Sequence, residues 1–257
     1  MRRHRAAPAR AGSREEQSVS THLIGGGWDE AAAGLVYGPF LKAAGDAPTV
    51  AVLLMDEGDG AEYFARFERV LRRTARCTPV PVLVPLGGVP DLGALDGADA
   101  LLIGGGLTPA YQDALGGLRT ELPALLAARG LPYAGFSAGA AVAAGTAVVG
   151  GWRSAGVPIC PEETGEDLEE IELRPGLGLV PFTVDVHAAQ WGTLPRLIEA
   201  VARGGVRQGV AIDENTVLTV DAGTARVSGT GRVHLVQADG SGVGLRAYRA
   251  GESFAFD

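Results

Sequence analysis

Cysteine is scarce in this chain: its 257 residues include only Cys77 and Cys160. Two isolated cysteines cannot build a disulfide framework, so we expect buried or incidental thiols. Histidine is scarce as well, and the four histidines show neither metal-ligand spacing nor cysteine neighbours. Because a zinc site needs several such ligands at defined spacings, the sequence predicts no metal centre, and we expect no cofactor.

Long apolar runs and basic surfaces are also missing. No apolar stretch approaches the roughly 20 residues that span a bilayer, so a membrane protein is not expected. The net charge is −8, with no basic stripe in the folded part, which argues against nucleic acid as the main partner. The arginine-rich residues 1–20 lack the apolar core of a secretory signal. We expect a disordered tail there and a cytoplasmic protein.

The chain does have enough apolar residues for one large α/β domain, which we place at residues 21–257. Hydrophobic residues make up 46% of the chain and aromatic residues only 6%, so Ala, Val and Leu must fill the core. Apolar runs typical of buried parallel strands alternate with helical segments, which is the pattern of βαβ units. After a short strand in "THLIGGGWD", we expect strands at 49–56, 79–86, 98–106 and 131–136, with helices at 34–44, 61–75 and 109–128.

The second half of the chain departs from this alternation. Residues 150–182 form a loop rich in Pro, Gly and acid, followed by a strand at 182–187 and a helix at 191–205. From residue 209 onward, short strands and turn dipeptides predict antiparallel hairpins. We therefore predict a mainly parallel sheet flanked by helices, with C-terminal antiparallel hairpins. In such sheets a site lies beyond the carboxyl ends of the parallel strands.

Three glycine-rich turns follow predicted strands: Gly25–Gly27, Gly104–Gly106 and Gly135–Gly139. In the third, "YAGFSAGAAVA", Ser137 lies between a strand and a helix of small residues. A Gly-x-Ser-x-Gly pattern in that context is typical of a nucleophile elbow, in which a strained turn lifts the hydroxyl above the sheet. Ser137 could instead be the N-cap of the helix, since serine is a preferred cap. A cap does not need the two glycines, whereas an elbow does, so we predict a nucleophile.

A serine nucleophile needs a base, and His187 is the only histidine at the expected carboxyl end of a core strand. The base in turn needs a carboxylate that fixes its tautomer. The oxyanion hole would combine the N–H of Ala138 with a backbone N–H of the turn that contains Gly105 and Gly106. For the acid, spacing alone leaves three candidates: Asp185, Asp213 and Glu214.

These motifs resemble a known family. The run "LLIGGGLT", the elbow "GFSAGA", the "DVH" before an amphipathic helix and the strand "GVAIDENTVL" look like the serine peptidases that include aspartyl dipeptidase (peptidase E) and cyanophycinase. The resemblance covers roughly residues 22–220. It implies a fold similar to class I glutamine amidotransferases, and a Ser-His-Glu triad of Ser137 as nucleophile, His187 as base and Glu214 as acid. The implied activity is that of a serine peptidase or amide hydrolase, which acts through an acyl-enzyme.

Two departures from the family pattern concern the substrate. Gln190 and Trp191 stand where cyanophycinases have basic residues, and Leu107 follows the three glycines where the dipeptidases have Asn. Both changes remove polar groups that would recognise an acidic substrate. We expect Leu107, Gln190 and Asp185 to contact substrate or to support the triad. The expected substrate is a small peptide or an amino-acid amide, and a homodimer is the candidate assembly.

An acidic stretch, "CPEETGEDLEEIEL", lies between the elbow helix and the Asp-x-His strand, with seven carboxylates in residues 162–172. Long irregular segments at strand ends often act as lids, and an acidic lid would favour neutral or basic residues over Asp beside the scissile bond. The alternative is a solvated acidic turn that faces water. Three other functions stay open: a catalytically silent member that binds a peptide or amino acid, an amidotransferase-type glutaminase, and an esterase of the α/β-hydrolase type.

Overall fold

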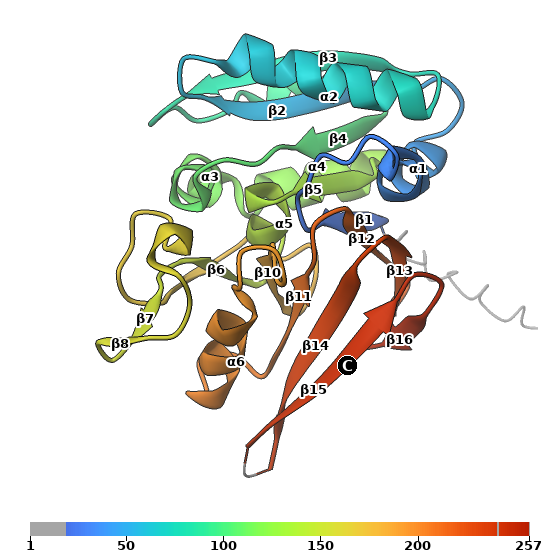
Figure 1. Ribbon diagram of the computed structural model, residues 1–257. Helices are drawn as coiled ribbons and strands as arrows, with labels where there is room; N and C mark the ends of the chain where they lie inside the picture. The colour runs from blue at the N-terminus through green and yellow to red at the C-terminus, as the bar shows by residue number, and fades with distance from the viewer. Residues whose placement is uncertain (1–18, 241, 257) are drawn as a thin grey trace, which may run out of the picture.

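The computed structural model describes residues 19–240 and 242–256, so the tail predicted for residues 1–20 lies almost wholly outside the described residues. Its largest feature is an eight-stranded sheet in the order β16-β13-β12-β1-β5-β4-β2-β3 (Figure 1). Five neighbouring strands of this sheet run parallel: β1 (Thr21–Ile24), β5 (Tyr133–Phe136), β4 (Ala100–Ile103), β2 (Thr49–Asp56) and β3 (Thr78–Pro85). The mainly parallel α/β fold predicted from the sequence is confirmed.

The strands β1, β5, β4 and β2 are buried on both faces because helices cover each side, whereas the edge strand β3 is half exposed. The apolar run of β2 alternates between the faces, and its side chains join a different hydrophobic cluster on each. One face is covered by α1 (Ala33–Ala43) and α2 (Gly60–Thr74). The opposite face is covered by α3 (Thr108–Leu115), α4 (Glu121–Arg129) and α5 (Ala138–Val142).

The C-terminal strands extend this sheet and build a second one. The antiparallel strands beside β1 are β12 (Thr216–Asp221), β13 (Thr224–Gly229) and β16 (Ser253–Ala255). The second sheet has the order β10-β11-β14-β15, with β10 (Thr183–Val186), β11 (Gln208–Ile212), β14 (Arg232–Asp239) and β15 (Gly242–Arg249). One of its faces joins the large core, and α6 (Leu194–Ala202) packs on the other. The β12–β13 and β14–β15 pairs confirm the predicted antiparallel hairpins.

The helices predicted at 109–128 and after Ser137 differ from the observed ones. The helix predicted at 109–128 is interrupted by a 3₁₀ turn, η2 (Gly116–Leu118), because two consecutive glycines weaken a helix. The helix predicted after Ser137 ends at Val142, and the chain continues into β6 (Thr146–Gly150), where β-branched residues favour a strand. Another 3₁₀ turn, η1 (Leu92–Leu95), precedes β4.

The segment predicted as an irregular loop, residues 150–182, contains short strand pairs. Within it, β7 (Arg153–Ser154) pairs with β8 (Val157–Pro158), and β9 (Glu172–Pro175) pairs with the preceding strand β6. A 3₁₀ turn, η3 (Glu162–Thr164), lies between β8 and β9. Figure 1 shows this segment in yellow, at the same end of the molecule as α3 and α6. None of the described helices is long and apolar enough to cross a membrane.

Candidate active site

Ser137 occupies a strained turn between β5 and α5. Its φ of 52° and ψ of −112° lie in a region that residues other than glycine rarely adopt. A Cβ on Gly135 would clash with the carbonyl of Gly139, and a Cβ on Gly139 would clash with the carbonyl of Ile103. Both glycines are therefore sterically required, as the elbow pattern predicts. Ser137 does occupy the N-cap position of α5, but its side chain makes no capping hydrogen bond and contacts His187 instead.

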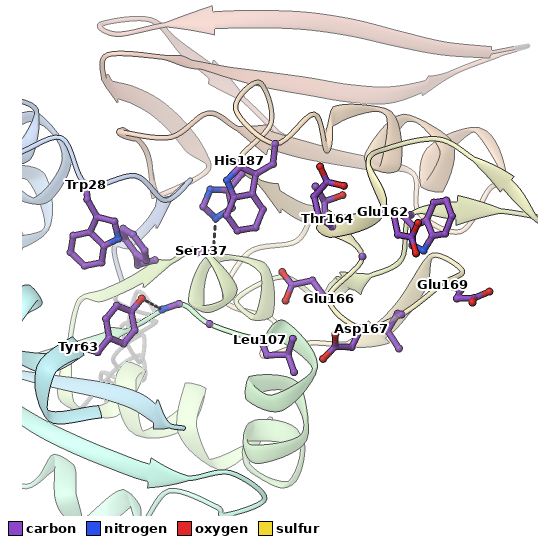
Figure 2. Close-up of a pocket in the computed structure, with 18 residues that line it drawn as sticks. Trp28, Tyr63, Leu107, Ser137, Glu162, Thr164, Glu166, Asp167, Glu169 and His187 are labelled. Carbon is purple, nitrogen blue, oxygen red and sulfur yellow. Dashed lines mark hydrogen bonds between the residues drawn. The ribbon is translucent and has the colours of Figure 1, made fainter. Parts of the chain in front are cut away.

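The imidazole of His187 lies between Ser137 and Glu214. His187 directly follows β10, and its Nε2 lies 2.8 Å from Ser137 Oγ (Figure 2). Its Nδ1 lies 2.8 Å from Glu214 Oε1. Ser137 and His187 are buried, whereas Glu214 is partly exposed. The structure thus brings together the residues that the resemblance implies as nucleophile, base and acid. With Nδ1–H donating to Glu214, Nε2 is free to accept the Ser137 hydroxyl proton.

The acids that spacing left open have different surroundings. Glu214 lies in the turn after β11, and its backbone N–H donates to Gln190 Oε1 over 2.8 Å. Asp213 instead accepts two backbone N–H groups and lies 3.3 Å from His234 Nε2. Its carboxylate therefore holds the turn in shape, while Glu214 contacts the imidazole of His187.

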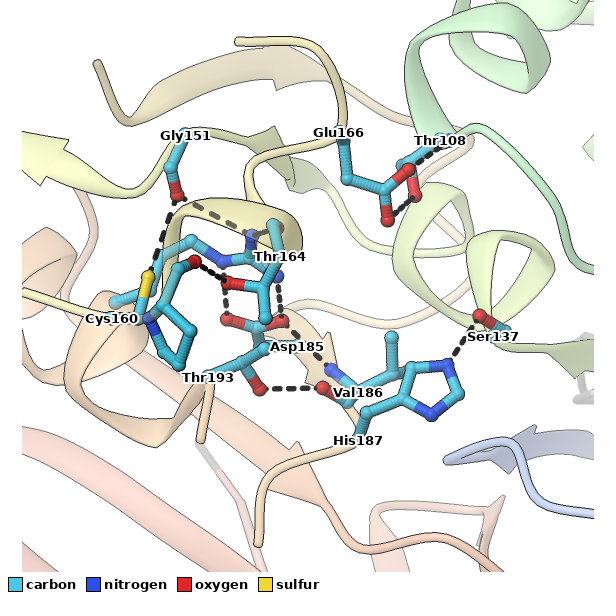
Figure 3. Close-up of polar contacts among 12 residues, drawn as sticks. Thr108, Ser137, Gly151, Cys160, Thr164, Glu166, Asp185, Val186, His187 and Thr193 are labelled. Carbon is cyan, nitrogen blue, oxygen red and sulfur yellow. Dashed lines mark hydrogen bonds and ion pairs between the residues drawn. The ribbon is translucent and has the colours of Figure 1, made fainter. Parts of the chain in front are cut away.

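Asp185 lies behind the site (Figure 3). Its carboxylate forms a bidentate ion pair with Arg196, over 2.7 Å and 2.9 Å, and both side chains are almost wholly buried. Arg196 also donates to the carbonyl oxygens of Thr164 and Gly151, which belong to the segment that lines the cleft. Both carboxylate oxygens bind Arg196, and one of them also accepts the backbone N–H of Val186, next to His187. Asp185 therefore supports the wall of the cleft and the end of β10, and a contact with substrate or support of the triad stays a prediction.

The sequence does not reveal a role for the first glycine turn, Gly25–Gly27. A Cβ on Gly26 would clash with the imidazole of His187, so this backbone packs directly against the ring. The Gly26 carbonyl accepts the N–H of Asn215 over 2.7 Å, and the Gly25 carbonyl accepts the N–H of His187 over 3.0 Å. The run of three glycines indicates in the sequence that a close backbone contact is needed there. Its partners, His187 and Asn215, lie much later in the chain and cannot be identified from the sequence.

The turn Gly104–Gly106 approaches Ser137 closely. A Cβ on Gly105 would lie 2.9 Å from Ser137 Cβ, so glycine permits an approach that a side chain would block. The Gly105 N–H donates to Tyr63 Oη over 3.3 Å. Ala138 is the first residue of α5, where a backbone N–H has no intrahelical acceptor. These are the N–H groups that the sequence suggests as oxyanion donors.

Burial tunes the titrating groups at this site. It lowers the pKa of His187 below its ordinary value of 6.5, and the hydrogen bond to Glu214 offsets only part of that effect. The imidazole is therefore neutral near pH 7, the state in which Nε2 accepts a proton. Burial also raises the pKa of Tyr63 to about 12, so its hydroxyl keeps its proton and can donate a hydrogen bond.

A cleft of about 620 Å³ opens beside Ser137 and has two chemically different ends. Figure 2 shows Trp28 and Tyr63 at one end, and acidic side chains at the other, with Ser137 and His187 between them. No lysine or arginine is among the described residues that line the cleft. The acidic end is formed by five carboxylates: Glu162, Glu163, Glu166, Asp167 and Glu169.

Glu166 connects the acidic segment, residues 162–169, to the start of α3. Its carboxylate accepts the backbone N–H of Thr108 over 2.8 Å and the Thr108 hydroxyl over 3.1 Å (Figure 3). Burial raises the pKa of Glu166. Leu107, directly before Thr108, also lines the cleft. Within the described parts of the chain, these carboxylates do not gather with His or Cys side chains into a group that could hold a metal ion.

Comparison with known proteins gives three findings. A model of peptidase family S51 matches residues 48–228. Cyanophycinases from Synechococcus elongatus and Thermosynechococcus vestitus are each 31% identical to the chain over 183 residues, which is 70% of this chain and 47% of theirs. The chain thus spans about half the length of the curated relatives it matches. The crystal structure of a candidate peptidase E from Listeria monocytogenes EGD-e shares the fold, with a TM-score of 0.55 at 14% identity, over 82% of this chain and 98% of that one.

Proposed function

The chain belongs to peptidase family S51, and from this membership we propose a serine-type peptidase or amide hydrolase that cleaves small peptides through an acyl-enzyme on Ser137. The observation that carries the proposal is the pair of 2.8 Å contacts that link Ser137, His187 and Glu214. A serine hydroxyl is a poor nucleophile at neutral pH, and a neutral imidazole in hydrogen-bond contact supplies the missing base.

In the proposed reaction, Ser137 Oγ attacks the amide carbonyl while its proton passes to His187 Nε2. The tetrahedral intermediate then expels the amine, which takes that proton from the imidazolium and leaves an acyl-serine. Water, deprotonated by the same Nε2, hydrolyses the ester and frees Ser137. Glu214 keeps its negative charge throughout, holds the Nδ1–H and stabilises the imidazolium.

The negative charge on the carbonyl oxygen needs preorganised donors. We assign this role to the backbone N–H groups of Ala138, Gly105 and Gly106. The Gly105 N–H would exchange Tyr63 for the substrate oxygen, since its hydrogen bond to Tyr63 Oη is long at 3.3 Å. One such donor is worth about 10²- to 10³-fold in kcat, so a loop change that turns it away would be costly.

The two ends of the cleft support a substrate that is neutral or basic beside the scissile bond. Five carboxylates at one end attract an amine or a basic side chain and repel an aspartyl side chain. The Trp28 and Tyr63 rings at the other end offer an apolar surface. The arginine that follows His187 does not change this, because Arg196 is buried against Asp185.

The first test is covalent labelling. A fluorophosphonate probe should label Ser137 in the wild-type protein and not in Ser137→Ala, and a screen of dipeptides and amino-acid amides should release amine only with the wild type. We expect Ser137→Ala to fold normally and to lose at least about 10³-fold in kcat. An unlabelled wild type with no turnover would favour a catalytically silent, ligand-binding member, and unchanged hydrolysis by Ser137→Ala would refute the scheme.

The acid is tested by a matched pair of neighbours. Glu214→Gln should lower kcat by about 10³- to 10⁴-fold, because the wrong imidazole tautomer harms the transition state and not substrate binding. Asp213→Asn removes a carboxylate from the adjacent residue and should cost far less in kcat. If Asp213→Asn proves the more damaging of the two, the assignment of Glu214 is wrong.

A further inference from the structure

The indole of Trp191 stacks on the imidazole of His187. The ring centroids lie 3.8 Å apart and the ring planes differ by 7°. Trp191 lies on the turn after β10, and its backbone N–H donates to the His187 carbonyl over 2.9 Å, which folds this turn back over the imidazole. Although the indole packs on a buried ring, 44% of Trp191 remains exposed. The sequence showed Trp191 only as the residue that replaces an expected basic group.

The same turn also holds the acid. The Gln190 side chain accepts the backbone N–H of Glu214, and the Ala189 N–H donates to Asp213. Residues 189–191 therefore contact the imidazole face, the backbone of Glu214 and the carboxylate beside it. From another direction, the Gly26 backbone approaches Cε1 of His187 so closely that no side chain fits there. The imidazole is confined by the indole on its face and by the Gly26 backbone at Cε1.

We propose that Trp191 is a positioning residue, whose indole holds the His187 imidazole in its reactive orientation and stabilises the imidazolium that forms during catalysis. The inference rests on the proposed function. Rotation of the ring about its Cβ–Cγ bond would break both 2.8 Å contacts, to Ser137 and to Glu214, and the stacked indole blocks that rotation.

The stack also stabilises the positive charge that forms on the His187 imidazole during the proposed reaction. The imidazole is neutral before the reaction and positive at the transition state, and an aromatic face attracts a cation. The interaction is therefore stronger in the transition state than in the resting enzyme, which is the condition for raising kcat. Glu214 stabilises the same positive charge through Nδ1, in the plane of the imidazole ring. The indole lies on the face of that ring, so its stabilisation adds to that of Glu214.

The test compares two substitutions at one position. Trp191→Leu removes the aromatic face, and we expect kcat to fall about tenfold, which is about 1.4 kcal/mol of transition-state stabilisation, with KM little changed. Trp191→Phe keeps an aromatic face and should stay within about threefold of the wild type. The substrate is the dipeptide or amide that the screen finds to be hydrolysed fastest.

Trp28→Leu is the matched control, because Trp28 lines the same cleft at the end away from the acidic segment. It should raise KM more than it lowers kcat. Trp191→Leu with unchanged kcat, or a Trp28→Leu that lowers kcat equally, would overturn the proposal, since the indole would then be only a wall of the cleft.

A measurement without substrate shows the contact itself. In proton NMR, the His187 Cε1–H signal is assigned by its loss in His187→Gln. Its ring-current displacement should disappear in Trp191→Leu and persist in Trp191→Phe. An identical chemical shift in the wild type and Trp191→Leu would contradict the stack.

The outcomes separate the inference from the proposed function. A wild type that neither reacts with the probe nor hydrolyses any substrate contradicts the proposed function, and with it the catalytic role of Trp191. An active wild type with unchanged kcat in Trp191→Leu contradicts the role of Trp191 alone.

Discussion

At the scale of single residues, the site is built on strained backbone. Ser137 has a φ of 52°, His187 a φ of 56°, and Asn215, next to Glu214, a φ of 55°. Each such conformation costs about 1–3 kcal/mol and persists only where the surroundings fix it. Glycines do so here, since Gly135 and Gly139 admit the Ser137 turn and the Gly25–Gly27 turn packs against His187 and Asn215. Three separate turns with unusual backbone conformations thus place the side chains of Ser137, His187 and Glu214 in contact.

The pH dependence of the reaction follows from the burial of His187. The base must be neutral to accept the Ser137 proton, so activity is lost as the pH falls through the pKa of His187. Burial places that pKa below 6.5, and the rate of Ser137 labelling by a fluorophosphonate probe should therefore be half-maximal below pH 6.5. The probe carries no titrating group near this range, so the profile reports the enzyme.

Glu214→Gln provides the control for that profile. Glu214 raises the pKa of His187 against the effect of burial, so its neutral substitute should move the residual profile to still lower pH. A half-maximal rate at or above pH 6.5 in the wild type would contradict the assignment of His187 as a buried, neutral base.

At the scale of elements, the sequence predicts those parts that rest on local patterns. The strand expected at 49–56 is β2 without change of bounds, and the helix expected at 61–75 differs from α2 by one residue at each end. The strand is an almost uninterrupted apolar run, and the helix has a strong helical periodicity over its whole length. The helix expected at 191–205 is shorter in the structure, Leu194–Ala202, because Gly192 with a φ of 72° and Pro195 delay its start.

What the sequence could not predict are contacts between distant elements. Spacing left Asp185, Asp213 and Glu214 equivalent, because each follows or ends a strand and the partner of each lies on another element. The buried pair of Asp185 with Arg196 depends on how α6 packs on β10, and the stack of Trp191 on His187 depends on a turn of the backbone. The resemblance selected Glu214, which is the acid that contacts His187.

The pair Asp185–Arg196 joins three elements, so it should matter for stability. Arg196→Met leaves the Asp185 carboxylate buried without its ionic partner and removes the donor to the carbonyl oxygens of Thr164 and Gly151. We expect the free energy of unfolding to fall by about 3–5 kcal/mol. Urea unfolding measures this change. Arg72→Met is the control, because its ion pair with Glu68 is exposed and should be worth about 0–1 kcal/mol. Equal losses in the two variants would show that the buried pair has no special structural role.

At the scale of the whole molecule, the site exists because two sheets meet. Ser137 follows β5 of the large sheet, His187 follows β10 of the second, and Glu214 lies in the turn by which the chain passes from the second sheet back to the first. A single hydrophobic cluster includes residues from strands of both sheets. The contacts among Ser137, His187 and Glu214 therefore depend on how the two sheets pack against each other. The acidic segment lies beside the second sheet in Figure 1, and its carboxylates line one end of the cleft, which gives that end a negative field.

That field predicts a preference for substrate charge. With a net charge of −8 and five carboxylates at one end of the cleft, the protein should hydrolyse a Lys-containing dipeptide faster than the matched Ala dipeptide, and the Asp dipeptide slowest. We expect kcat/KM for Lys to exceed that for Asp by about tenfold at low salt, and the ratio to shrink at high salt because ions screen exposed carboxylates. Glu163→Gln should reduce the ratio, whereas Asp46→Asn, which removes an equal charge from an exposed loop after α1, should leave it unchanged. A preference for Asp that survives high salt would contradict the prediction, and would mean that a positive group outside the described lining of the cleft recognises the substrate.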